Sequence, residues 1–592
     1  MKIPAISDPT RVIRAMLAAA FSAPDPGCTP GQVLSIAEGT KHMKPEIPDY
    51  AEAYASFSAE AVERRALSGS LLTGTNVCVE CCDRHAEDAD RPALHWISRD
   101  WRSRTYGFAE LRALSARFAN LLRASGIGPG DRVAGLLPRI PELLVVVLGT
   151  WRAGAVYQPL FTALGTQAIE HRLATAGTSL VVTDAANRPK LRDIAACPPV
   201  LTVSAAGRDE GTAGSERDFW AETEAQPSEF APVPRRGEDP FLMLFTSGTT
   251  GRAKGVAVPL QALLSYDVYM REGLDLRPED VYWNMADPGW AYGFWFAVLG
   301  PLMLGHATML CEAPFSAETT WRVVRERGVT NLAGAPTAFR MLMAAGAEAA
   351  AGLRGQLRAI SSAGEPLNPE VIRWAEAVLG CPIRDHYGQT ELGMAICNHH
   401  GLAHPYRPGT TGLAVPGYRL AVLDDAQREV PPGTPGVLAL DRAGSPLFWF
   451  RGYWNSDTPN FVDGWYLTGD SVRRDADGTF TFVGRRDDII TSAGYRIGPF
   501  EVESALIEHP AVAEAAVVGR PDPERTEVVV AHVVLKPGAE GSPRLAGELQ
   551  ELVRRRVGAH AYPRAVEFVA ELPKTPSGKI QRHLLRAGTQ QR

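Results

Sequence analysis

The chain has 592 residues, of which 45% are hydrophobic and 22% charged, and its net charge at pH 7 is −6. A single hydrophobic core stops growing near about 250–300 residues, so this length predicts several domains. The small negative charge argues against a general attraction to nucleic acid or to an anionic membrane surface. These values favour a multidomain globular enzyme.

The sequence predicts neither a membrane-spanning segment nor an export signal. No stretch approaches the roughly 18–20 uncharged apolar residues that a membrane span requires. The apolar segment Ala15–Ala23 follows Lys2, Arg11 and Arg14, but it is short and Asp8 interrupts its flank. We therefore expect neither an integral membrane segment nor a signal peptide.

Eight cysteines are scattered along the chain, which argues against a disulfide framework and favours a reducing, cytoplasmic compartment. The stretch CVECCDRH groups Cys78, Cys81, Cys82 and His85, but no second Cys/His pair stands at a zinc-site spacing. At helical spacing Val77, Cys81, Cys82 and His85 share one face. We expect buried helix cysteines here in preference to a metal site.

Residues 1–75 look irregular and are expected to form an N-terminal extension. Helical patterns then alternate with apolar runs, which predicts layered α/β structure. These runs are residues 132–138, 155–161 and 179–184. The apolar run Leu143–Thr150 fits a buried strand or a helix turn. Residues 205–239, rich in Gly, Ser, Glu and Pro, are expected to form a surface excursion.

The sequence changes character after Gly484. A turn and a loop lead to a helix that opens near Pro499 and to a short strand, which together predict a compact α+β unit. We place a domain boundary at Arg486–Asp488. Residues 76–486 are then a large domain and residues 487–592 a small one.

The stretch TSGTTGRAKGV, residues 246–256, follows the apolar run Phe241–Phe245 and has the composition of a phosphate-binding loop. Backbone amides in a glycine-rich turn, hydroxyls and a lysine all favour a bound anion. The Walker pattern requires a glycine five residues after Gly248, where this chain has Ala253, and Lys254 is followed by glycine instead of Ser or Thr. A P-loop NTPase is therefore not indicated.

This stretch resembles the signature of the adenylate-forming superfamily, which includes acyl- and aryl-CoA synthetases, luciferases and peptide-synthetase adenylation domains. Five further stretches are similar to motifs of that family and occur in its order: SSAGEPLNPE (361–370), DHYGQTELG (385–393), GWYLTGD (464–470), GRRDDIITSAGYRI (484–497) and LPKTPSGKI (572–580). The resemblance covers roughly residues 75–585. It implies an α/β fold, with a large N-terminal multi-layer α/β domain and a small mobile α+β C-terminal lid domain.

The motifs suggest where a nucleotide would bind. Gly364, Glu365 and Pro366 offer a backbone edge to adenine, Tyr387 a stacking face, and Asp385 lies close by in the sequence. Asp470 is suited to accept hydrogen bonds from both ribose hydroxyls, and Arg485 to donate to the same sugar. The nucleotide- and coenzyme-contacting positions implied by the resemblance are Thr246, Ser247, Gly248, Thr249, Thr250, Lys254, Gly364, Glu365, Pro366, Asp385, Tyr387, Gln389, Thr390, Asp470, Arg485, Gly494, Arg496 and Arg554.

The resemblance implies catalytic roles for Lys579, Glu391 and Thr246. Glu391 is the expected protein ligand of Mg²⁺, a cation that prefers one or two carboxylates with phosphate oxygens and water. Thr390 is placed to donate to the α-phosphate. Lys579 is the implied adenylation lysine, whose ammonium stabilises the charge that develops as pyrophosphate departs. Lys254 is then expected to bind the pyrophosphate end.

The implied reaction has two steps around one site. A substrate carboxylate attacks the α-phosphorus of Mg·ATP and forms an acyl-adenylate and pyrophosphate, and the thiol of coenzyme A then displaces AMP. The small domain is implied to rotate between the steps, with Asp487 at the hinge. Gly494 would leave room for the pantetheine arm. Arg554, in a run of three arginines, is either a coenzyme A phosphate contact or part of a solvated helix face.

The resemblance is close to short- and medium-chain acyl-CoA synthetases, through ADPGW (286–290) and GAPTAFR (334–340). Acetate-specific enzymes have a tryptophan at the position of Gly388 and a valine at that of Ala363, so both residues are expected to enlarge the acyl pocket. Trp290, Ala291 and Tyr292 are further candidates for its wall. We expect an aliphatic acid of intermediate size, larger than acetate, while a branched short acid and an aryl acid stay open.

Two other functions are compatible with parts of the sequence. One is an adenylation enzyme that loads an acyl or aryl acid onto a carrier protein, although Arg554 favours coenzyme A. The other is a nucleotide-binding regulatory protein without catalysis, which the intact set of motif residues argues against. Acylation of Lys579, in a loop expected to be exposed, would remove the charge needed in the first step. A homo-oligomer is compatible with the sequence, and no nucleic-acid partner is expected.

Overall fold

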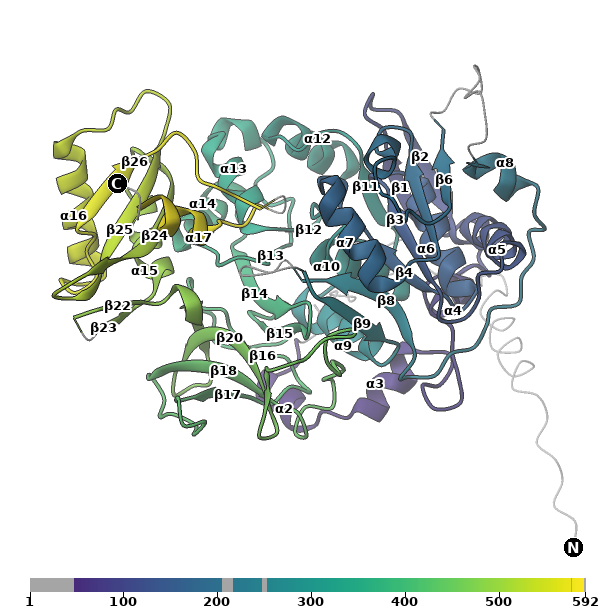
Figure 1. The fold of residues 1–592 in the computed structure, drawn as a ribbon, viewed down its shortest axis with the longest axis horizontal. Coiled ribbons are helices and arrows are strands. Elements are labelled where there is room, and N and C mark those ends of the chain that lie inside the picture. Colours follow the sequence, from purple (N-terminus) through teal and green to yellow (C-terminus); the bar gives the residue numbers. More distant parts are fainter. Residues whose placement is uncertain (1–46, 205–216, 247–252, 494, 576–577, 590–592) are drawn as a thin grey trace, which may run out of the picture. The chain divides into compact units, whose positions relative to one another are not determined.

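The structure is a computed structural model that describes residues 47–204, 217–246, 253–493, 495–575 and 578–589 (Figure 1). Residues 48–592 cluster into one compact unit. The described residues form five β-sheets with helices between them, in the mixed α/β arrangement that the motifs implied. No helix among them is both long enough and apolar enough to cross a membrane.

The first large sheet is parallel except at one edge. Its strands, in spatial order, are β7 (Arg217–Asp218), β6 (Val200–Val203), β5 (Leu180–Asp184), β3 (Arg132–Leu136), β4 (Val156–Pro159), β8 (Pro240–Phe245) and β9 (Gly255–Pro259), with β9 antiparallel to β8. The predicted runs at 132–138, 155–161 and 179–184 are thus confirmed as strands. The connecting helices are α5 (Phe108–Ala124), α6 (Pro141–Arg152), α7 (Thr166–Ala176) and α8 (Phe219–Glu224).

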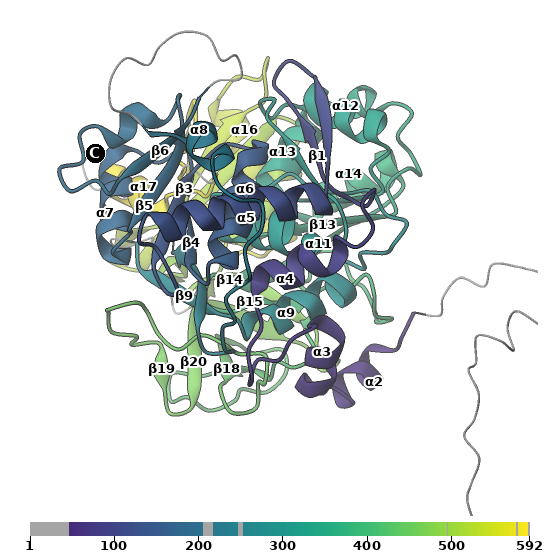
Figure 2. The same ribbon diagram turned by 90° about the vertical axis from the view of Figure 1, so that its right-hand side faces the viewer.

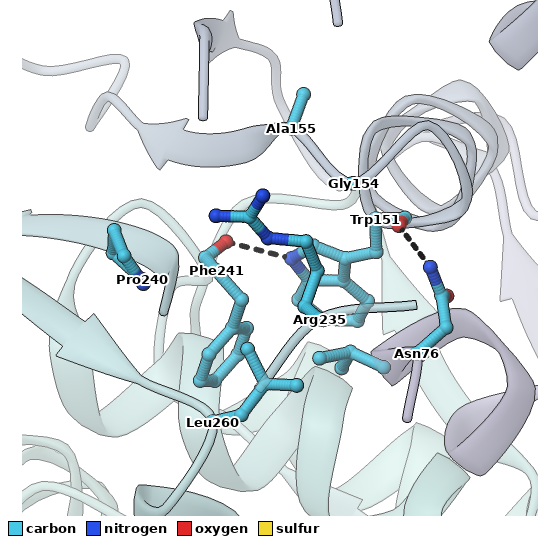
Figure 3. Close-up of a pocket in the computed structure, with 9 residues that line it drawn as sticks. Asn76, Trp151, Gly154, Ala155, Arg235, Pro240, Phe241 and Leu260 are labelled. Carbon is cyan, nitrogen blue, oxygen red and sulfur yellow. Dashed lines mark hydrogen bonds between the residues drawn. The ribbon is translucent and has the colours of Figure 1, made fainter. Parts of the chain in front are cut away.

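The apolar run Leu143–Thr150 belongs to α6, which begins with Pro141 at its first turn and is buried on all sides. Figure 2 shows α5 beside α6, and the two helices contact each other. The Trp151 indole at the end of α6 donates to the Phe241 carbonyl of β8 at 2.9 Å, and Asn76 donates to the Trp151 carbonyl at 2.7 Å (Figure 3). The Trp151 bond fixes the end of α6 against the strand that precedes the phosphate-binding loop.

The second large sheet has four parallel strands followed by two antiparallel ones. In spatial order these are β10 (Tyr282–Asn284), β12 (Asn331–Gly334), β13 (Ala359–Ala363), β14 (Ile383–Gln389), β15 (Gly393–Cys397) and β16 (Leu413–Ala414). Its connecting helices include α12 (Ala317–Arg327), α13 (Pro336–Ala344) and α14 (Pro369–Leu379). The Ser316 hydroxyl caps α12 by accepting from the Thr319 amide at 3.0 Å, and Gly328 ends it in the left-handed conformation.

Two smaller sheets complete this part of the chain. One contains β11 (Thr308–Cys311), β1 (Pro92–Ile97) and β2 (Ser103–Gly107). The other is antiparallel and contains β17 (Leu420–Leu423), β18 (Pro435–Asp441), β20 (Trp465–Arg474), β19 (Phe461–Val462) and β21 (Phe480–Arg485). The second sheet places Asp470 directly opposite Arg485, because the two residues are partners in the β20–β21 register.

The C-terminal residues form a separate sheet with its own hydrophobic core. Its strands are β23 (Tyr495–Ile497), β22 (Ile490–Ser492), β25 (Thr526–Leu535), β24 (Val512–Asp522) and β26 (Ala565–Phe568). The helices α15 (Pro499–Ile507), α16 (Pro543–Arg556) and α17 (Arg582–Thr589) contact this sheet or each other. The predicted helix near Pro499 is confirmed, but the strand that follows it has 11 residues and is not short.

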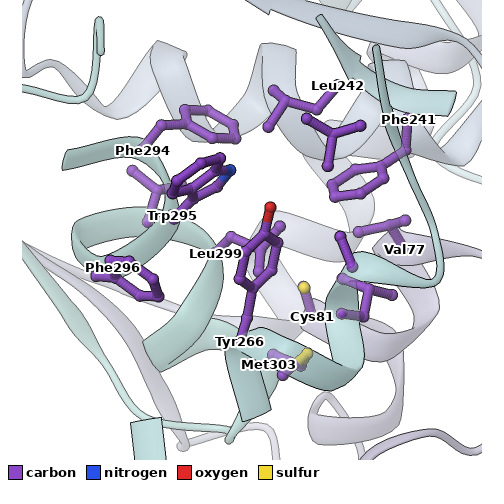
Figure 4. Packing of buried hydrophobic residues seen from close by; sticks show 14 of the residues in the cluster. Val77, Cys81, Phe241, Leu242, Tyr266, Phe294, Trp295, Phe296, Leu299 and Met303 are labelled. Carbon is purple, nitrogen blue, oxygen red and sulfur yellow. The ribbon is translucent and has the colours of Figure 1, made fainter. Parts of the chain in front are cut away.

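The main core lies around a long helical segment that includes α10 (Ala291–Gly293), a π-helical stretch (Phe294–Leu299) and α11 (Gly300–Met303). Figure 4 shows Phe294, Trp295 and Leu299 of this segment packed with Tyr266 of α9 (Ala262–Val268). The same core contains α4 (Val77–Cys81), in which Cys78 and Cys81 are buried. The expectation of buried helix cysteines is confirmed, and Cys82, directly after α4, is buried as well.

The prediction of an irregular segment is wrong for residues 50–66. This part forms α2 (Tyr50–Ala55) and α3 (Ala59–Ala66), capped by the side chains of Asp49 and Ser58. The two helices are short, and α3 buries Val62 and Ala66 and contacts α9. Tertiary packing therefore stabilises a segment whose local pattern is weak.

Candidate active site

The candidate site residues lie at the carboxyl ends of parallel strands. Thr246 follows β8, Gly364 follows β13, and Thr390 and Glu391 follow β14. Ligands of open α/β sheets bind at these ends because the loops there diverge and leave backbone groups unpaired. Three of the six motif stretches, far apart in the sequence, therefore converge through the order of the strands.

The phosphate-binding loop is closed at its base by two hydrogen bonds. The Thr246 amide donates to the Lys254 carbonyl at 3.0 Å, and the Lys254 amide donates to the Thr246 hydroxyl at 3.2 Å. His171 of α7 lies beside this closure, with its Nε2 2.8 Å from the Ala253 carbonyl. The predicted contacts Ser247, Gly248, Thr249 and Thr250 lie outside the described residues.

Asp470 is the centre of a buried hydrogen-bond network. Its Oδ2 accepts from the Tyr387 hydroxyl at 2.6 Å and from Gln389 Nε2 at 2.7 Å. Gln389 also donates to the Thr468 carbonyl and accepts from the Tyr466 hydroxyl. Arg485 Nη1 lies 3.7 Å from the other carboxylate oxygen, Oδ1. Residues of β14 thus orient the carboxylate on β20.

Burial raises the pKa of Asp470, and the Arg485 charge and the bonds from Tyr387 and Gln389 oppose this rise. Burial likewise raises the pKa of Glu391, and a hydrogen bond from Tyr453 opposes it. The Tyr453 hydroxyl donates to Glu391 Oε1 at 2.8 Å. Donors that favour the ionised form therefore accompany both buried carboxylates.

The segment after β13 brings the expected adenine edge next to the expected acyl wall. Gly364 has φ +100°, and a Cβ atom there would lie 3.2 Å from the Trp290 indole. Both facts favour glycine at this position. Asp385, which pairs with Ser362 in the β13–β14 register, has a buried Oδ1 without a partner among the described residues. Pro366, which ends the expected adenine edge, is half-buried.

Lys579 lies beside the same carboxylates, although it comes from the C-terminal unit. Burial lowers the pKa of Lys579, and the charges of Glu365 and Asp470 oppose this effect. At the preceding residue, Gly578, a Cβ atom would lie 3.5 Å from the Thr337 hydroxyl and 3.6 Å from Glu365 Oε1. Lys579 is half-buried, so the expectation of an exposed loop is wrong for this arrangement.

Helix α14 of the large part contacts α15 of the C-terminal unit near this loop. Asn368 Nδ2 donates to the Ser504 hydroxyl at 3.1 Å, and Arg373 lies 3.3 Å from Glu508. Within the large part, Thr337 and Arg340 both donate to Glu365. The first two contacts join the C-terminal unit to the large part, and the last two position Glu365, whose carboxylate lies near Gly578.

The remaining predicted residues of the C-terminal unit lie away from these contacts or outside the described residues. Asp487 is exposed in a single 3₁₀ turn, Arg486–Asp488. Arg554 lies in the last turn of α16, where its guanidinium lies 4.5 Å from the Tyr562 ring and 3.7 Å from Glu551. Gly494 lies outside the described residues, as does the side chain of Arg496 in β23.

The acyl-wall candidates lie together, but Gly388 does not border open space. Ala363 is buried at the end of β13, and Tyr292 is buried with ring centroids 6.0 Å from Trp290. Ala291, which lies between these two aromatic residues in the sequence, is half-buried.

A Cβ atom at Gly388 would lie 2.2 Å from the Gly393 carbonyl oxygen and 2.8 Å from the Met394 sulfur. The expectation that this glycine leaves free volume is not met. Gly388 instead permits close approach of β14 and β15 at a register irregularity.

Sequence reasoning missed Tyr453, Tyr466 and Thr337. Tyr453 lies in an irregular stretch between β18 and β19, where no local pattern marks it. Tyr466 belongs to the quoted stretch GWYLTGD, but nothing in the sequence indicated its contact with Gln389. Thr337 and Arg340 belong to the quoted stretch GAPTAFR, but nothing in the sequence indicated their contact with Glu365. Only the tertiary structure brings these residues to the site.

Two family profiles match the chain. The one described as AMP-binding enzyme covers residues 82–454, and the one described as AMP-binding enzyme C-terminal domain covers residues 501–579. Among curated proteins, the acetyl-coenzyme A synthetase of Bacillus subtilis is 37% identical over 571 residues, which are 94% of this chain and 97% of that protein. The mitochondrial acyl-coenzyme A synthetase ACSM4 of Rattus norvegicus is 37% identical over 85% of this chain and 88% of its own length.

Two similar solved structures are also CoA synthetases or ligases by name. The acyl-CoA synthetase of Brucella canis is 56% identical, with a TM-score of 0.75, and the match covers 92% of this chain and 100% of that one. The anthranilate CoA ligase AuaEII in complex with anthranoyl-AMP is 27% identical, with a TM-score of 0.79, over 90% of this chain and 99% of that one.

Proposed function

Because the chain belongs to the AMP-binding enzyme family and is an AMP-forming acyl-CoA synthetase, we propose that it converts a carboxylic acid larger than acetate to the acyl-CoA through an acyl-adenylate. The observation that carries the proposal is the position of Lys579. It lies among Glu365, Asp470 and Glu391, whose charges act on its pKa. An ammonium in this place is suited to align a substrate carboxylate with the α-phosphate of ATP.

The nucleotide end of the proposed site fits ATP. The buried, unpartnered Asp385 Oδ1 is an acceptor that the adenine amino group would satisfy. The backbone of Gly364 to Pro366 would lie along the base. Asp470, held by Tyr387 and Gln389, would accept from the ribose hydroxyls, with Arg485 beside it.

The phosphate end would be bound by Thr246, Thr390 and Lys254. A magnesium ion would fit beside Glu391, whose carboxylate is a hard oxygen donor close to the base of the phosphate-binding loop. When bound, the ion would neutralise phosphate charge. The chain itself supplies the loop amides, the Thr246 and Thr390 hydroxyls and the two lysines.

The second step requires that Lys579 leave the site and that coenzyme A enter. We assign this change to rotation of residues 487–592 about Asp487, which lies in an exposed 3₁₀ turn between the two units. Gly494 and Arg496 would then line the pantetheine arm, and Arg554 would contact a phosphate of the coenzyme. Acylation of Lys579 would need the rotated state, because Lys579 is half-buried in the arrangement described.

The acid is the least constrained part of the proposal. The tryptophan of the acetate-specific pattern cannot stand at position 388, since even a Cβ atom there meets β15. The pocket must therefore end at other residues, and Trp290, Ala291, Tyr292 and Ala363 are the candidates. Relatives named for acetate, for acyl groups and for anthranilate all share the fold.

A panel of acids tests the proposal. Acid-dependent exchange of pyrophosphate into ATP and thioester formation with free coenzyme A would be measured for acetate, butanoate, hexanoate, 2-methylpropanoate and benzoate. We expect kcat/KM to rise about tenfold or more from acetate to the preferred acid, because each fitted methylene is worth about 1–3 kcal/mol. A higher kcat/KM for acetate than for every other acid would contradict the size preference, and failure of free coenzyme A to accept the acyl group would contradict the second step.

A further inference from the structure

Tyr453 occupies a position between two groups that the reaction needs. It lies in the irregular stretch 442–460, between β18 and β19. Its hydroxyl donates to Glu391 Oε1 at 2.8 Å, and the Lys254 ammonium lies 4.5 Å from the centre of its ring. One side chain therefore contacts both the carboxylate that follows β14 and the lysine that ends the phosphate-binding loop.

The backbone around Tyr453 is fixed to that same loop. The amide of the next residue, Trp454, donates to the Gly255 carbonyl at 2.8 Å, and Gly255 directly follows Lys254. The Tyr453 amide donates to the Thr458 hydroxyl at 2.8 Å, and the Tyr453 ring packs against Phe450 with centroids 5.2 Å apart. The backbone hydrogen bonds of residues 453 and 454 and the packing against Phe450 thus fix the position of the Tyr453 ring.

The bond to Glu391 has a chemical consequence. Glu391 is buried, and the Tyr453 hydroxyl is a direct donor to its carboxylate. A hydroxyl that donates to Oε1 stabilises the carboxylate and fixes its rotation, which leaves Oε2 as the oxygen available to a cation. Residues that orient a metal ligand in this way typically contribute about 10–100-fold to metal affinity.

The contact with Lys254 has a different consequence. Lys254 is exposed, and an exposed lysine side chain samples many rotamers. A cation over the face of an aromatic ring gains about 0.5–1 kcal/mol at an exposed site. The ring therefore favours rotamers in which the ammonium stays near Glu391, on the side where phosphate would bind.

We propose that Tyr453 is a positioning residue that couples the two phosphate-binding groups: its hydroxyl orients Glu391 for the cation and its ring holds Lys254 for the departing pyrophosphate. This inference rests on the proposed roles of Glu391 and Lys254. It adds to them that a single tyrosine sets both groups before ATP arrives.

The test is ATP binding without an acid substrate, so that no turnover occurs. Calorimetric Kd values for ATP would be measured with excess Mg²⁺ and with EDTA for the wild type, Tyr453→Phe and Tyr453→Leu. We expect Tyr453→Phe to bind ATP as the wild type does in EDTA but to lose about 10-fold or more of the affinity gained with Mg²⁺. Tyr453→Leu should lose this gain and also bind about threefold more weakly in EDTA, because the ring is gone.

Two controls separate positioning from damage to the fold. Tyr106→Phe, in β2, alters another tyrosine whose ring lies under an arginine, and it should change neither Kd. In a Glu391→Gln background, Tyr453→Phe should have no further effect on the Mg²⁺-dependent gain, because the two residues act as one unit.

Each result has a distinct meaning. If the wild type gains no ATP affinity from Mg²⁺, the proposed role of Glu391 fails. If the wild type gains affinity and Tyr453→Phe gains equally, the inference about Tyr453 is overturned while the proposed function stands. Additive losses in the double variant would also overturn it.

Discussion

Lys254 and Lys579 end two loops that are closed in the same way but lie in different surroundings. In each loop a threonine amide donates to the lysine carbonyl, and the lysine amide donates to the same threonine's hydroxyl: Thr246 with Lys254, and Thr575 with Lys579. Lys254 is exposed and lies over the Tyr453 ring, whereas Lys579 is half-buried among carboxylates. The backbone closure presents a lysine, and the surroundings determine what that lysine does.

The largest effect should come from removing the Lys579 ammonium. Lys579→Ala should lower the rate of acyl-adenylate formation about 10²–10³-fold, because the charge developed as pyrophosphate leaves loses its partner. Thioester formation from a chemically made acyl-adenylate should stay within a few-fold of the wild type. Single-turnover assays of each half-reaction measure the two rates. An equal loss of rate in adenylation and in thioester formation would contradict a role of Lys579 that is specific to the first step.

The pH dependence of the first half-reaction should report Lys579. Burial lowers the pKa of Lys579, and the lysine acts in its protonated form, so the rate should fall as pH rises and should begin to fall below the pKa of an ordinary lysine, about 10.4. Lys579→Arg should remove this alkaline limb, because arginine stays charged. Pyrophosphate exchange across the alkaline range measures it, and a limb that survives in Lys579→Arg would assign the titration to another group.

Removing the exposed ammonium should have a smaller effect, confined to the phosphates. Lys254→Gln should raise the Kd of ATP about tenfold and leave the Kd of AMP unchanged, since AMP has no β- and γ-phosphate for Lys254 to bind. Calorimetry with both nucleotides measures this difference. Equal losses for ATP and AMP would show that Lys254 acts on the α-phosphate or on the fold.

The smallest effects should come from opening the closures themselves. Thr246→Val and Thr575→Val each remove one acceptor of a backbone amide, which is worth about 0.5–1.5 kcal/mol or a few-fold in affinity or rate. Thr246→Val should weaken ATP binding. Thr575→Val should slow adenylation and leave the Kd of ATP unchanged. The same phenotype in both variants would contradict separate roles for the two loops.

The sequence motifs predicted the fold class and the segments that form the site, because several of them follow or end a strand whose apolar run is visible in the sequence. Phe241–Phe245 before the phosphate-binding loop is an example, and it forms β8. The motifs did not predict α2 and α3, whose stability comes from packing and not from a local pattern. They also did not predict the role of Tyr453, because its contacts are distant in the sequence. Glu391 lies 62 positions before it and Lys254 lies 199 positions before it.

Gly388 shows a further limit. A glycine in place of a large side chain suggests added volume when only the sequence is known. In the fold, a Cβ atom at this position would lie 2.2 Å from the Gly393 carbonyl oxygen of β15, so no free volume exists there. The effect of a deleted side chain depends on whether its neighbours collapse into the space.

The burial of the cysteines has a practical consequence for studying the lid. Six of the seven cysteines among the described residues are buried, Cys197 being half-buried. Burial raises the pKa of Cys81 and Cys397 well above the ordinary range for a thiol, and a hydrogen bond with Cys78, together with burial, does the same for the pKa of Cys82. Alkylating reagents attack thiolates, so these native thiols should react slowly in the folded protein. A maleimide dye or a nitroxide spin label would then attach selectively to a cysteine introduced at exposed Asp487 once Cys28 and Cys197 are replaced by serine, and its signal would test the proposed rotation of residues 487–592.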